Sequence, residues 1–263
     1  MFNGKSSLDY GLTIENLPDA AFPERRGEAY DIDGRNGTRF REDGTFENYE
    51  QTYDVFIRDE ATKRNVYEIS GDIAKWLIGS SGYCRLEDTY FPESFRLARF
   101  AGSVNFSAVL RRYGRATLVF NCQPERYLKS GEDAIEIDLT SGSTIGNPTG
   151  FTALPKITVL GSGTVGLSLL NMARPLDPAL TIRLDIGSSQ KTIVLDSETC
   201  TAKAFDITHL NGYDFDSNVT FSGPQYATFP QFNAGSYIIQ PATGETYTGT
   251  ISQIEIVPRW WTL

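Results

Sequence analysis

The stretch Pro23-Glu-Arg-Arg-Gly-Glu-Ala-Tyr-Asp-Ile-Asp-Gly-Arg-Asn-Gly-Thr38 decides how the N-terminal half of the chain folds. A charged run leads into a short segment of strand formers and then breaks at Gly34-Arg35-Asn36-Gly37. Asn36-Gly37 is expected to supply the positive φ angles of a tight reversal. The stretch therefore predicts one arm of a β-hairpin between Pro23 and Asn48, with the charged segment Arg39–Gly44 at its projecting tip.

Strands are expected on both sides of this hairpin. Leu12–Ile14 is a short candidate strand before it, and Asn48–Arg58 alternates between apolar and polar residues after it. One face of the second strand carries Tyr49, Tyr53, Val55 and Ile57. Phe56 falls on the polar face and does not fit the alternation.

One helix is expected, because apolar residues recur at helical spacing between positions 66 and 77. Asn65 and Glu68 form a capping-box pattern at its start, and Gly79 ends it. The apolar stripe, which is expected to face the core, consists of Val66, Ile69, Ile73, Trp76 and Leu77. Further strands are expected at Tyr83–Leu86, Phe95–Phe100, Val104–Leu110 and Ala116–Cys122.

The segment Leu139–Gly150 is poor in apolar residues and rich in turn formers, so it is expected to link two domains. Only strands are expected after it: Ile157–Leu160, Val165–Leu170, Leu180–Ile186, Lys191–Leu195, Thr199–Phe205, Tyr237–Gln240 and Thr250–Val257. The fold class is therefore mainly β, with two β-sandwich domains. Residues 1–138 form the first, with a packed helix and a projecting hairpin, and residues 151–263 form the second.

Composition supports this fold class and excludes some functions. The chain has 263 residues, 40% of them apolar, and 13 tyrosines and 16 phenylalanines against 2 methionines favour strands. A net charge of −9 argues against sequence-independent nucleic-acid binding and against docking on an anionic membrane. No signal peptide or membrane span is evident, so we expect synthesis in a cytoplasm.

No catalytic, metal or cofactor site is expected. Cys84, Cys122 and Cys200 lack zinc or redox spacing and are interpreted as buried thiols. Gly161-Ser-Gly-Thr-Val-Gly166 matches a dinucleotide fingerprint as a string, but the segment after it is too short for the helix that would hold a pyrophosphate. The only histidine, His209, can be imagined with Ser197 and Asp206 as a triad, yet no nucleophile elbow surrounds the serine.

Short strings spread along the chain carry a family resemblance. In the first half they are Asp9-Tyr10-Gly11-Leu12, Asp33-Gly34-Arg35-Asn36-Gly37, Tyr49-Glu50, Ile73-Ala74-Lys75-Trp76-Leu77 and Phe120-Asn121-Cys122-Gln123-Pro124. In the second half they are Asn147-Pro148, Gly161-Ser162-Gly163, Ile193-Val194-Leu195-Asp196-Ser197-Glu198, Phe229-Pro230-Gln231-Phe232-Asn233-Ala234-Gly235 and Pro258-Arg259-Trp260-Trp261-Thr262-Leu263. With these strings the chain resembles the distal tail proteins of long-tailed bacteriophages, throughout its length.

The resemblance implies a structural, non-enzymatic protein of the virion tail tip, made in the host bacterial cytoplasm. It implies a homo-hexameric ring, alone or as two stacked rings, that joins the tail tube protein to the tail-tip fibre protein and the receptor-binding protein. The N-terminal domain would form the ring, partly through its hairpin, and the C-terminal domain would be galectin-like. The interface candidates are Arg25, Arg26, Tyr30, Arg35, Asn36, Arg39 and Arg41, and the core candidates are Tyr53, Val55, Ile69, Ile73, Trp76, Leu77, Trp260 and Trp261.

Such a ring would let DNA pass without holding it, so acidic residues of the first domain are expected to line the bore. The basic cluster Arg111-Arg112 with Arg115 is the feature that fits this expectation least. Two other functions stay open. A carbohydrate-binding adhesin is the first, because tyrosine-rich sandwiches can stack on sugars, and a cell-wall hydrolase is the second.

Overall fold

The computed structural model describes residues 1–58, 64–102, 105–110, 113–223, 228–244 and 246–263, and for residues 108–110 it describes the backbone alone. The described chain is mainly β with one α-helix, which confirms the predicted fold class. It divides into two compact units. Unit 1 comprises Met1–Arg126 with Leu263, and unit 2 comprises Tyr127–Thr262.

This division differs from the expected linker at Leu139–Gly150. The units part within strand β8 (Tyr113–Leu128), and the expected linker contains strand β10 (Ser143–Asn147) of unit 2. β10 pairs with β16 (Gly235–Pro241) along its whole length. The turn formers that precede it make a local turn, in which Asp138 Oδ1 accepts the N–H groups of Thr140 and Ser141.

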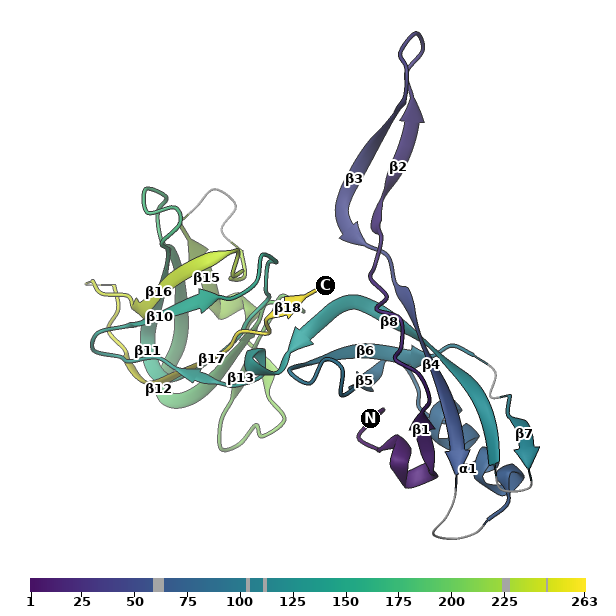
Figure 1. Ribbon diagram of the computed structural model, residues 1–263. Coiled ribbons are helices and arrows are strands. Elements are labelled where there is room, and N and C mark those ends of the chain that lie inside the picture. Colours follow the sequence, from purple (N-terminus) through teal and green to yellow (C-terminus); the bar gives the residue numbers. More distant parts are fainter. Residues whose placement is uncertain (59–63, 103–104, 111–112, 224–227, 245) are drawn as a thin grey trace. The chain divides into compact units, whose positions relative to one another are not determined.

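The main sheet of unit 1 has strands in the order β1-β4-β8-β6-β5 (Figure 1), and β7 also pairs with β8. β4 and β8 pair antiparallel, with Tyr49 opposite Cys122 and Arg58 opposite Tyr113. The bounds are β1 Leu12–Ile14, β4 Tyr49–Arg58, β5 Cys84–Leu86, β6 Ser94–Phe100 and β7 Ser107–Leu110, with a 3-10 helix at Ser7–Tyr10. Strands β2 (Arg25–Asp31) and β3 (Thr38–Phe46) form a separate hairpin.

Strand β4 follows the predicted alternation. Tyr49, Tyr53, Val55 and Ile57 are buried, because this face of the sheet carries the core. Phe56, which the alternation leaves on the outer face, stacks on Tyr113 of the neighbouring strand with ring centroids 5.9 Å apart. A cross-strand aromatic contact therefore accounts for the apolar residue on the polar face.

Helix α1 (Val66–Ile78) lies on the core side of this sheet, and its predicted apolar stripe is buried. The helix start differs from the expected capping box, because the Asn65 side chain accepts the N–H of Tyr67 at 2.6 Å. Trp76 Nε1 donates to the carbonyl of Phe2 at 3.0 Å. Its ring stacks on Tyr10, with centroids 4.5 Å apart, so the N-terminal segment is fixed to the helix.

A buried ion pair crosses the core of unit 1. Arg96 Nη1 lies 2.8 Å from Asp88 Oδ2, and the two side chains are 3% and 5% exposed. Asp88 also accepts the hydroxyl of Tyr53 and the N–H of Phe91, each at 2.9 Å. Burial opposes ionisation of Asp88, but the hydrogen bonds from Arg96 and Tyr53 outweigh it and lower the pKa of Asp88.

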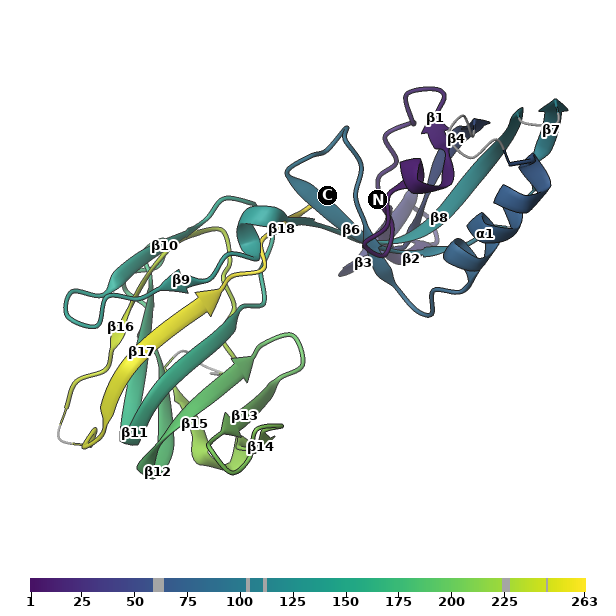
Figure 2. The same cartoon turned by 90° about the horizontal axis from the view of Figure 1, so that it is seen from below.

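Unit 2 is built on two long strands, β11 (Lys156–Asn171) and β12 (Leu180–Asp196), which pair with each other. The first half of β11 also pairs with β17 and its second half with β16, whereas β12 pairs first with β15 and then with β13. Figure 2 shows β9, β17, β11 and β12 side by side. The other bounds are β9 Ile135–Glu136, β13 Thr201–Phe205, β14 Tyr213–Asp214, β15 Val219–Ser222, β17 Thr250–Val257 and β18 Trp261–Thr262, with 3-10 helices at Lys129–Gly131 and Asp216–Asn218.

The sequence predicts two short strands where each long strand lies. The strands β11 and β12 continue through glycines that bend them without ending them. Around Gly163, which has a φ of +77° and lies opposite Gly187, the register shifts as it does at a β-bulge. A Cβ at Gly163 would lie 2.5 Å from the Cα of Gly249. The glycine-rich string at 161–166 therefore serves close backbone packing at a bend within a strand.

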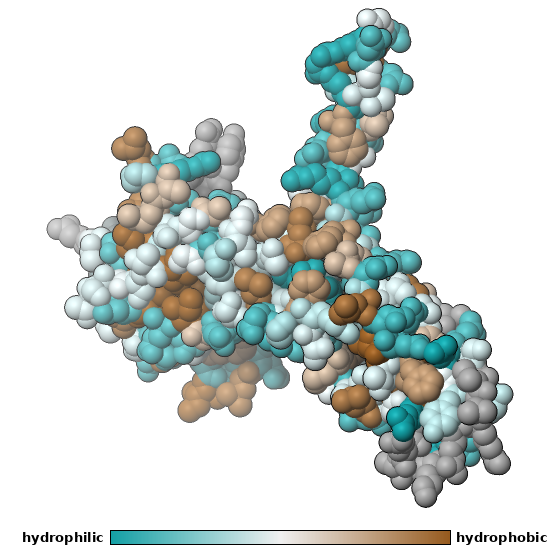
Figure 3. All heavy atoms as spheres, viewed as in Figure 1, coloured by the Kyte–Doolittle hydropathy of each residue, from teal (hydrophilic) through white to brown (hydrophobic). Residues whose placement is uncertain are grey.

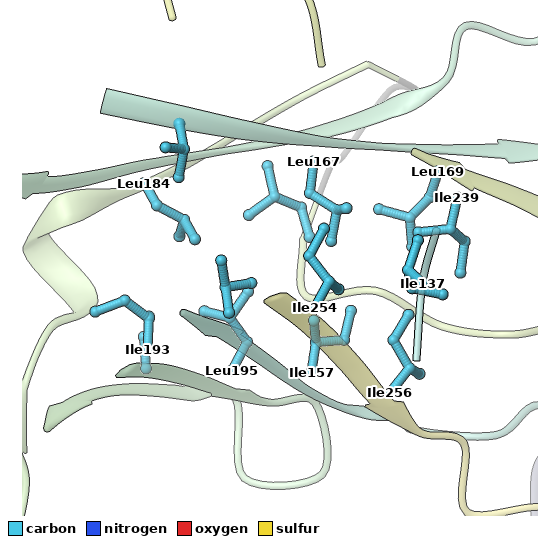
Figure 4. Packing of buried hydrophobic residues seen from close by; sticks show 14 of the residues in the cluster. Ile137, Ile157, Leu167, Leu169, Leu184, Ile193, Leu195, Ile239, Ile254 and Ile256 are labelled. Atoms are coloured by element: carbon cyan, nitrogen blue, oxygen red, sulfur yellow. The ribbon is translucent and has the colours of Figure 1, made fainter. Parts of the chain in front are cut away.

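The bend lets both halves of the long strands face one core. Figure 4 shows Ile157, Ile193 and Leu195 from one half facing Leu167 and Leu169 from the other. Strand β17 adds Ile254 and Ile256, and its pairing with β11 is irregular between Gln253 and Ile251.

The C-terminal segment of unit 2 is held by several contacts. Trp260 is buried beside Phe232, whereas Trp261 is half-buried and donates its Nε1–H to the carbonyl of Thr152 at 2.8 Å. Arg259 donates to both carboxylate oxygens of Asp196, at 2.7 and 2.9 Å. The remaining core candidates, Tyr53, Val55, Ile69, Ile73, Trp76 and Leu77, are buried in unit 1.

The cysteines differ from the expectation of three buried thiols. Cys122 is buried, Cys84 is half-buried and Cys200 is exposed. Cys200 has a φ of +51° and is the last residue of the turn between β12 and β13. No helix in the described part of the chain is long and apolar enough to cross a membrane.

Candidate functional site

The hairpin of β2 and β3 is the candidate functional site. Asp31 pairs with Thr38 at its distal end, and Gly27 pairs with Glu42 nearer the base. The tip is Ile32–Gly37, where Gly34 and Gly37 have φ angles of +78° and +82°. Asn36 does not have the positive φ expected of it. The charged segment Arg39–Gly44, expected at the tip, lies within β3, because the reversal is complete before Thr38.

Salt bridges hold the base of the hairpin. Arg25 lies 2.9 Å from Glu42, and Arg26 lies 2.9 Å from Glu47. These side chains are about half exposed, so each pair contributes little to stability in water. Near the end of β3, Thr45 donates its N–H and hydroxyl to Asp43, and these bonds lower the pKa of Asp43.

The distal half of the hairpin differs from its base in charge and polarity. Tyr30 lies opposite Arg39, and Glu28 lies opposite Arg41, so these four side chains share one face. In the described part of the chain, no ion pair involves Arg35, Arg39 or Arg41. Figure 3 shows the hairpin, at the top of the view, as mostly hydrophilic.

Large apolar side chains of the hairpin are also exposed. Phe40 is 53% exposed, Tyr30 47% and Ile32 38%. Phe40 lies on the face opposite Arg39 and Arg41, over the backbone of Gly27. The distal half thus offers cations on one face and an aromatic ring on the other, without a core beneath either.

The hairpin has no third strand among the described residues, and every residue of β2 is exposed. An isolated two-stranded hairpin is marginally stable in water, because it buries little apolar surface. Its two edges also leave backbone N–H and C=O groups open to pairing. A partner that covers it would remove both costs.

All seven interface candidates lie on this hairpin. Arg25 and Arg26 have partners in the same chain, at the base, so their charges are already neutralised. The tip carries Arg35 and Asn36, and the distal faces carry Tyr30, Arg39 and Arg41. Phe40, which is not among the seven candidates, is the most exposed large apolar side chain of the described hairpin. An apolar residue between Arg39 and Arg41 in a strand lies on the face opposite both, and this spacing is the sequence signal that points to Phe40.

His209, Asp206 and Ser197 are not joined as a hydrogen-bonded triad. His209 Nδ1 lies 3.0 Å from Asp206 Oδ1, within a turn whose N–H groups and Thr208 hydroxyl also bond to Asp206. These bonds lower the pKa of Asp206. The buried hydroxyl of Ser197 has no hydrogen-bond partner among the described residues, so His209 does not activate it. No group of three or more His, Cys, Asp or Glu side chains in the described ranges could hold a metal ion.

The basic cluster considered for the bore is only partly described. Arg115 forms a salt bridge with Glu15 of the same chain. Arg111 and Arg112 lie outside the described residues.

A solved phage structure has the same fold as this chain, whereas the sequence comparisons give no match. No protein-family model and no curated protein sequence matches the chain. The crystal structure of SPP1 Dit (gp 19.1), called a paradigm of the hub adsorption apparatus in phages that infect Gram-positive bacteria, aligns with 100% of this chain and 98% of its own. The TM-score is 0.69 and the identity 14%. A phage p2 baseplate structure aligns at a TM-score of 0.49 and 8% identity, over 94% of this chain and 90% of that one.

The chain therefore has the fold of a phage distal tail protein along its whole length. The resemblance predicted from short sequence strings is confirmed at the level of the fold.

Proposed function

We propose that this chain is a structural subunit of a bacteriophage tail tip, a distal tail protein without catalytic activity. The support is its full-length likeness to a phage hub protein. We further propose that it forms a hexameric ring, single or stacked in pairs, that joins the tail tube to the tail-tip fibre and receptor-binding proteins.

The observation that carries the ring is the exposed β2–β3 hairpin. A surface with open strand edges, exposed aromatic rings and unpaired arginines is costly in a monomer. Passing that surface to a neighbouring copy, which passes its own hairpin on in turn, closes a ring in which every hairpin is covered. Head-to-tail contacts of this kind need no second type of subunit.

The test compares the purified chain with a variant in which Gly27–Gly44 is replaced by two glycines. Light scattering and negative-stain imaging of the unaltered chain should give rings of six or twelve copies. The variant should remain folded but monomeric, because the replaced segment contributes no residue to the buried core. A control variant, with Pro175–Pro178 of unit 2 replaced by two glycines, should still form rings. A strict monomer at tens of micromolar, with rings also absent from virions, would contradict the proposal.

We also propose that DNA passes through the ring without being retained. The net charge of −9 per chain is multiplied sixfold in a hexamer, and an acidic lumen repels phosphates. Arg115 contributes little cationic character, since Glu15 neutralises it within the chain. Duplex DNA should therefore not bind the assembled ring even at low salt, where phosphate contacts are strongest. Salt-sensitive retention that Arg111→Glu with Arg112→Glu abolishes would refute an acidic bore.

A further inference from the structure

A groove of about 620 Å³ lies on the outer face of the unit 1 sheet. The residues that line it include Glu15, Asp54, Asn105, Arg115, Thr117 and Val119. Asp54 and Thr117 lie opposite each other on β4 and β8, and they alternate with neighbours whose side chains are buried. The groove is therefore on the face away from helix α1, which packs on the buried side.

The groove contains a carboxylate without a cation. Glu15 directly follows β1 and donates its N–H to the carbonyl of Asp54 on β4 at 2.8 Å, which places the two acidic residues opposite each other. Like charges in this arrangement repel. Arg115 neutralises Glu15, whereas Asp54 accepts only the Thr117 hydroxyl, at 2.7 Å, and no cation of the described chain pairs with it. A cation from outside would complete the site.

The distal hairpin has the complementary chemistry. Arg39 and Arg41 share a face and lie two residues apart, a spacing of about 7 Å along a strand. Neither has an ion-pair partner in the described ranges, and Tyr30 beside them is 47% exposed. The groove offers apolar surface for such a ring through Val119, which shares the outer face with Thr117. Charge and polarity therefore match between the two surfaces of the chain.

The hairpin is held away from the groove of its own chain. Only two residues separate the end of β3 from the start of β4, and both are fixed. Glu47 donates its N–H to the carbonyl of Glu24 at 2.8 Å, and Asn48 Nδ2 donates to Tyr83 at 2.6 Å and to Asn121 at 3.0 Å. With this base fixed and β3 nine residues long, about 30 Å, the distal arginines extend away from Asp54.

We propose that the groove at Asp54 receives the distal hairpin of a second copy of this chain, with Arg39 or Arg41 paired to Asp54. The inference rests on the proposed ring and specifies which surface of the neighbour the hairpin contacts. Each copy would then donate one hairpin and accept another. Because the hairpin and the groove are different surfaces, the contact between two copies would be head-to-tail.

A charge-swap experiment tests the contact. Asp54→Arg, Arg39→Glu and Arg41→Glu are each made alone, and Asp54→Arg is also combined with each arginine variant. Asp54→Arg, and the Glu substitution of whichever arginine pairs with Asp54, should each raise the protein concentration at which half the chains are assembled by about tenfold or more. Combining these two changes should return that concentration to within about threefold of the unaltered chain. Light scattering across a dilution series measures these midpoints, and circular dichroism confirms that the variants are folded.

Glu50→Arg is the matched control, because Glu50 lies on the same strand and the same outer face but does not line the groove. It should leave the midpoint within about threefold of the unaltered chain. If Asp54→Arg behaves like Glu50→Arg, or if neither combination recovers assembly, the hairpin binds elsewhere and the docking inference is wrong while the ring stands. If the unaltered chain never assembles, both the ring and the docking inference are wrong.

Discussion

Removing the charge of Asp88 should destabilise unit 1 strongly. Asp88→Asn keeps the shape of the side chain but leaves Arg96, whose side chain is 3% exposed, without its anion. Arg126 carries a second buried guanidinium, whose Cζ lies 4.0 Å from the centroid of the Phe91 ring that Arg96 also contacts, so two cations would lie there without the Asp88 charge. Breaking one partner of a buried pair costs about 3–5 kcal/mol. This is a large fraction of the total stability of a domain.

The exposed pair Arg64–Asp72 provides the matched control. It has the same separation of 2.8 Å, but its side chains are 35% and 42% exposed. Because solvent screens an exposed pair, Asp72→Asn should cost about 1 kcal/mol or less. The two pairs have equal N–O separation and unequal burial, so comparing them isolates the effect of desolvation, and Asp72 also lies 3.7 Å from Lys75.

Hydrogen exchange followed by mass spectrometry in increasing urea measures the loss of stability in Asp88→Asn and in Asp72→Asn. Peptides from β4 and β6 report on unit 1, and peptides from β11 and β12 report on unit 2 as an internal reference. Asp88→Asn should lower the protection of unit 1 peptides and leave unit 2 unchanged. A loss below about 1 kcal/mol, or one matched by Asp72→Asn, would refute the argument that the pair is stabilised by burial and mutual compensation.

Three further predictions follow from contacts in the two units. The pKa of Asp88 is lowered in the folded state, so its ionised form adds stability above the unfolded pKa of about 4, and the stability difference from Asp88→Asn should narrow as the pH falls below 4. Gly163→Ala should cost unit 2 about 2–4 kcal/mol in urea unfolding, and Gly187→Ala clearly less, because both need positive φ but only Gly163 would place a Cβ against backbone. Arg259→Ala should cost about 1–3 kcal/mol and Arg259→Lys somewhat less, because lysine keeps the charge but loses the bidentate bond to Asp196; equal losses would show that the charge alone matters.

The sequence predicts well those elements whose pattern is local. Alternation identified the buried face of β4, and helical spacing identified the stripe of α1, because each pattern lies within one continuous segment. The division at Arg126 was missed because β8 continues across it without a turn signal. Strand β10 was missed because a short, turn-rich edge strand has few apolar residues.

The glycines of β11 show a second limit of sequence patterns. A run of glycines after a strand fits both a phosphate-binding loop and a bend at which a strand continues into new partners. The difference lies in what a Cβ would contact, and at Gly161 and Gly163 that is the backbone of Thr250 and Gly249, almost ninety residues later in the chain. No local pattern contains this information, since it depends on the register of β11 against β17.

The hairpin and the proposed docking groove differ in how far a local sequence pattern predicts them. A polar, alternating segment around two glycines is enough to predict an exposed hairpin. The groove cannot be predicted from a local pattern, because Glu15, Asp54 and Thr117 come together only through the pairing registers of β1, β4 and β8.

This difference has an energetic consequence for the proposed assembly. The groove is part of a sheet that stays formed in the free chain, whereas the hairpin buries none of its β2 residues and is marginal until it is covered. The ordering cost of the hairpin is therefore included in the free energy of each contact, which weakens a single contact between two copies. Closing a ring compensates for this, because the last subunit makes two contacts while losing its translational freedom once. A weak pairwise contact in a closed assembly favours complete rings over partial ones.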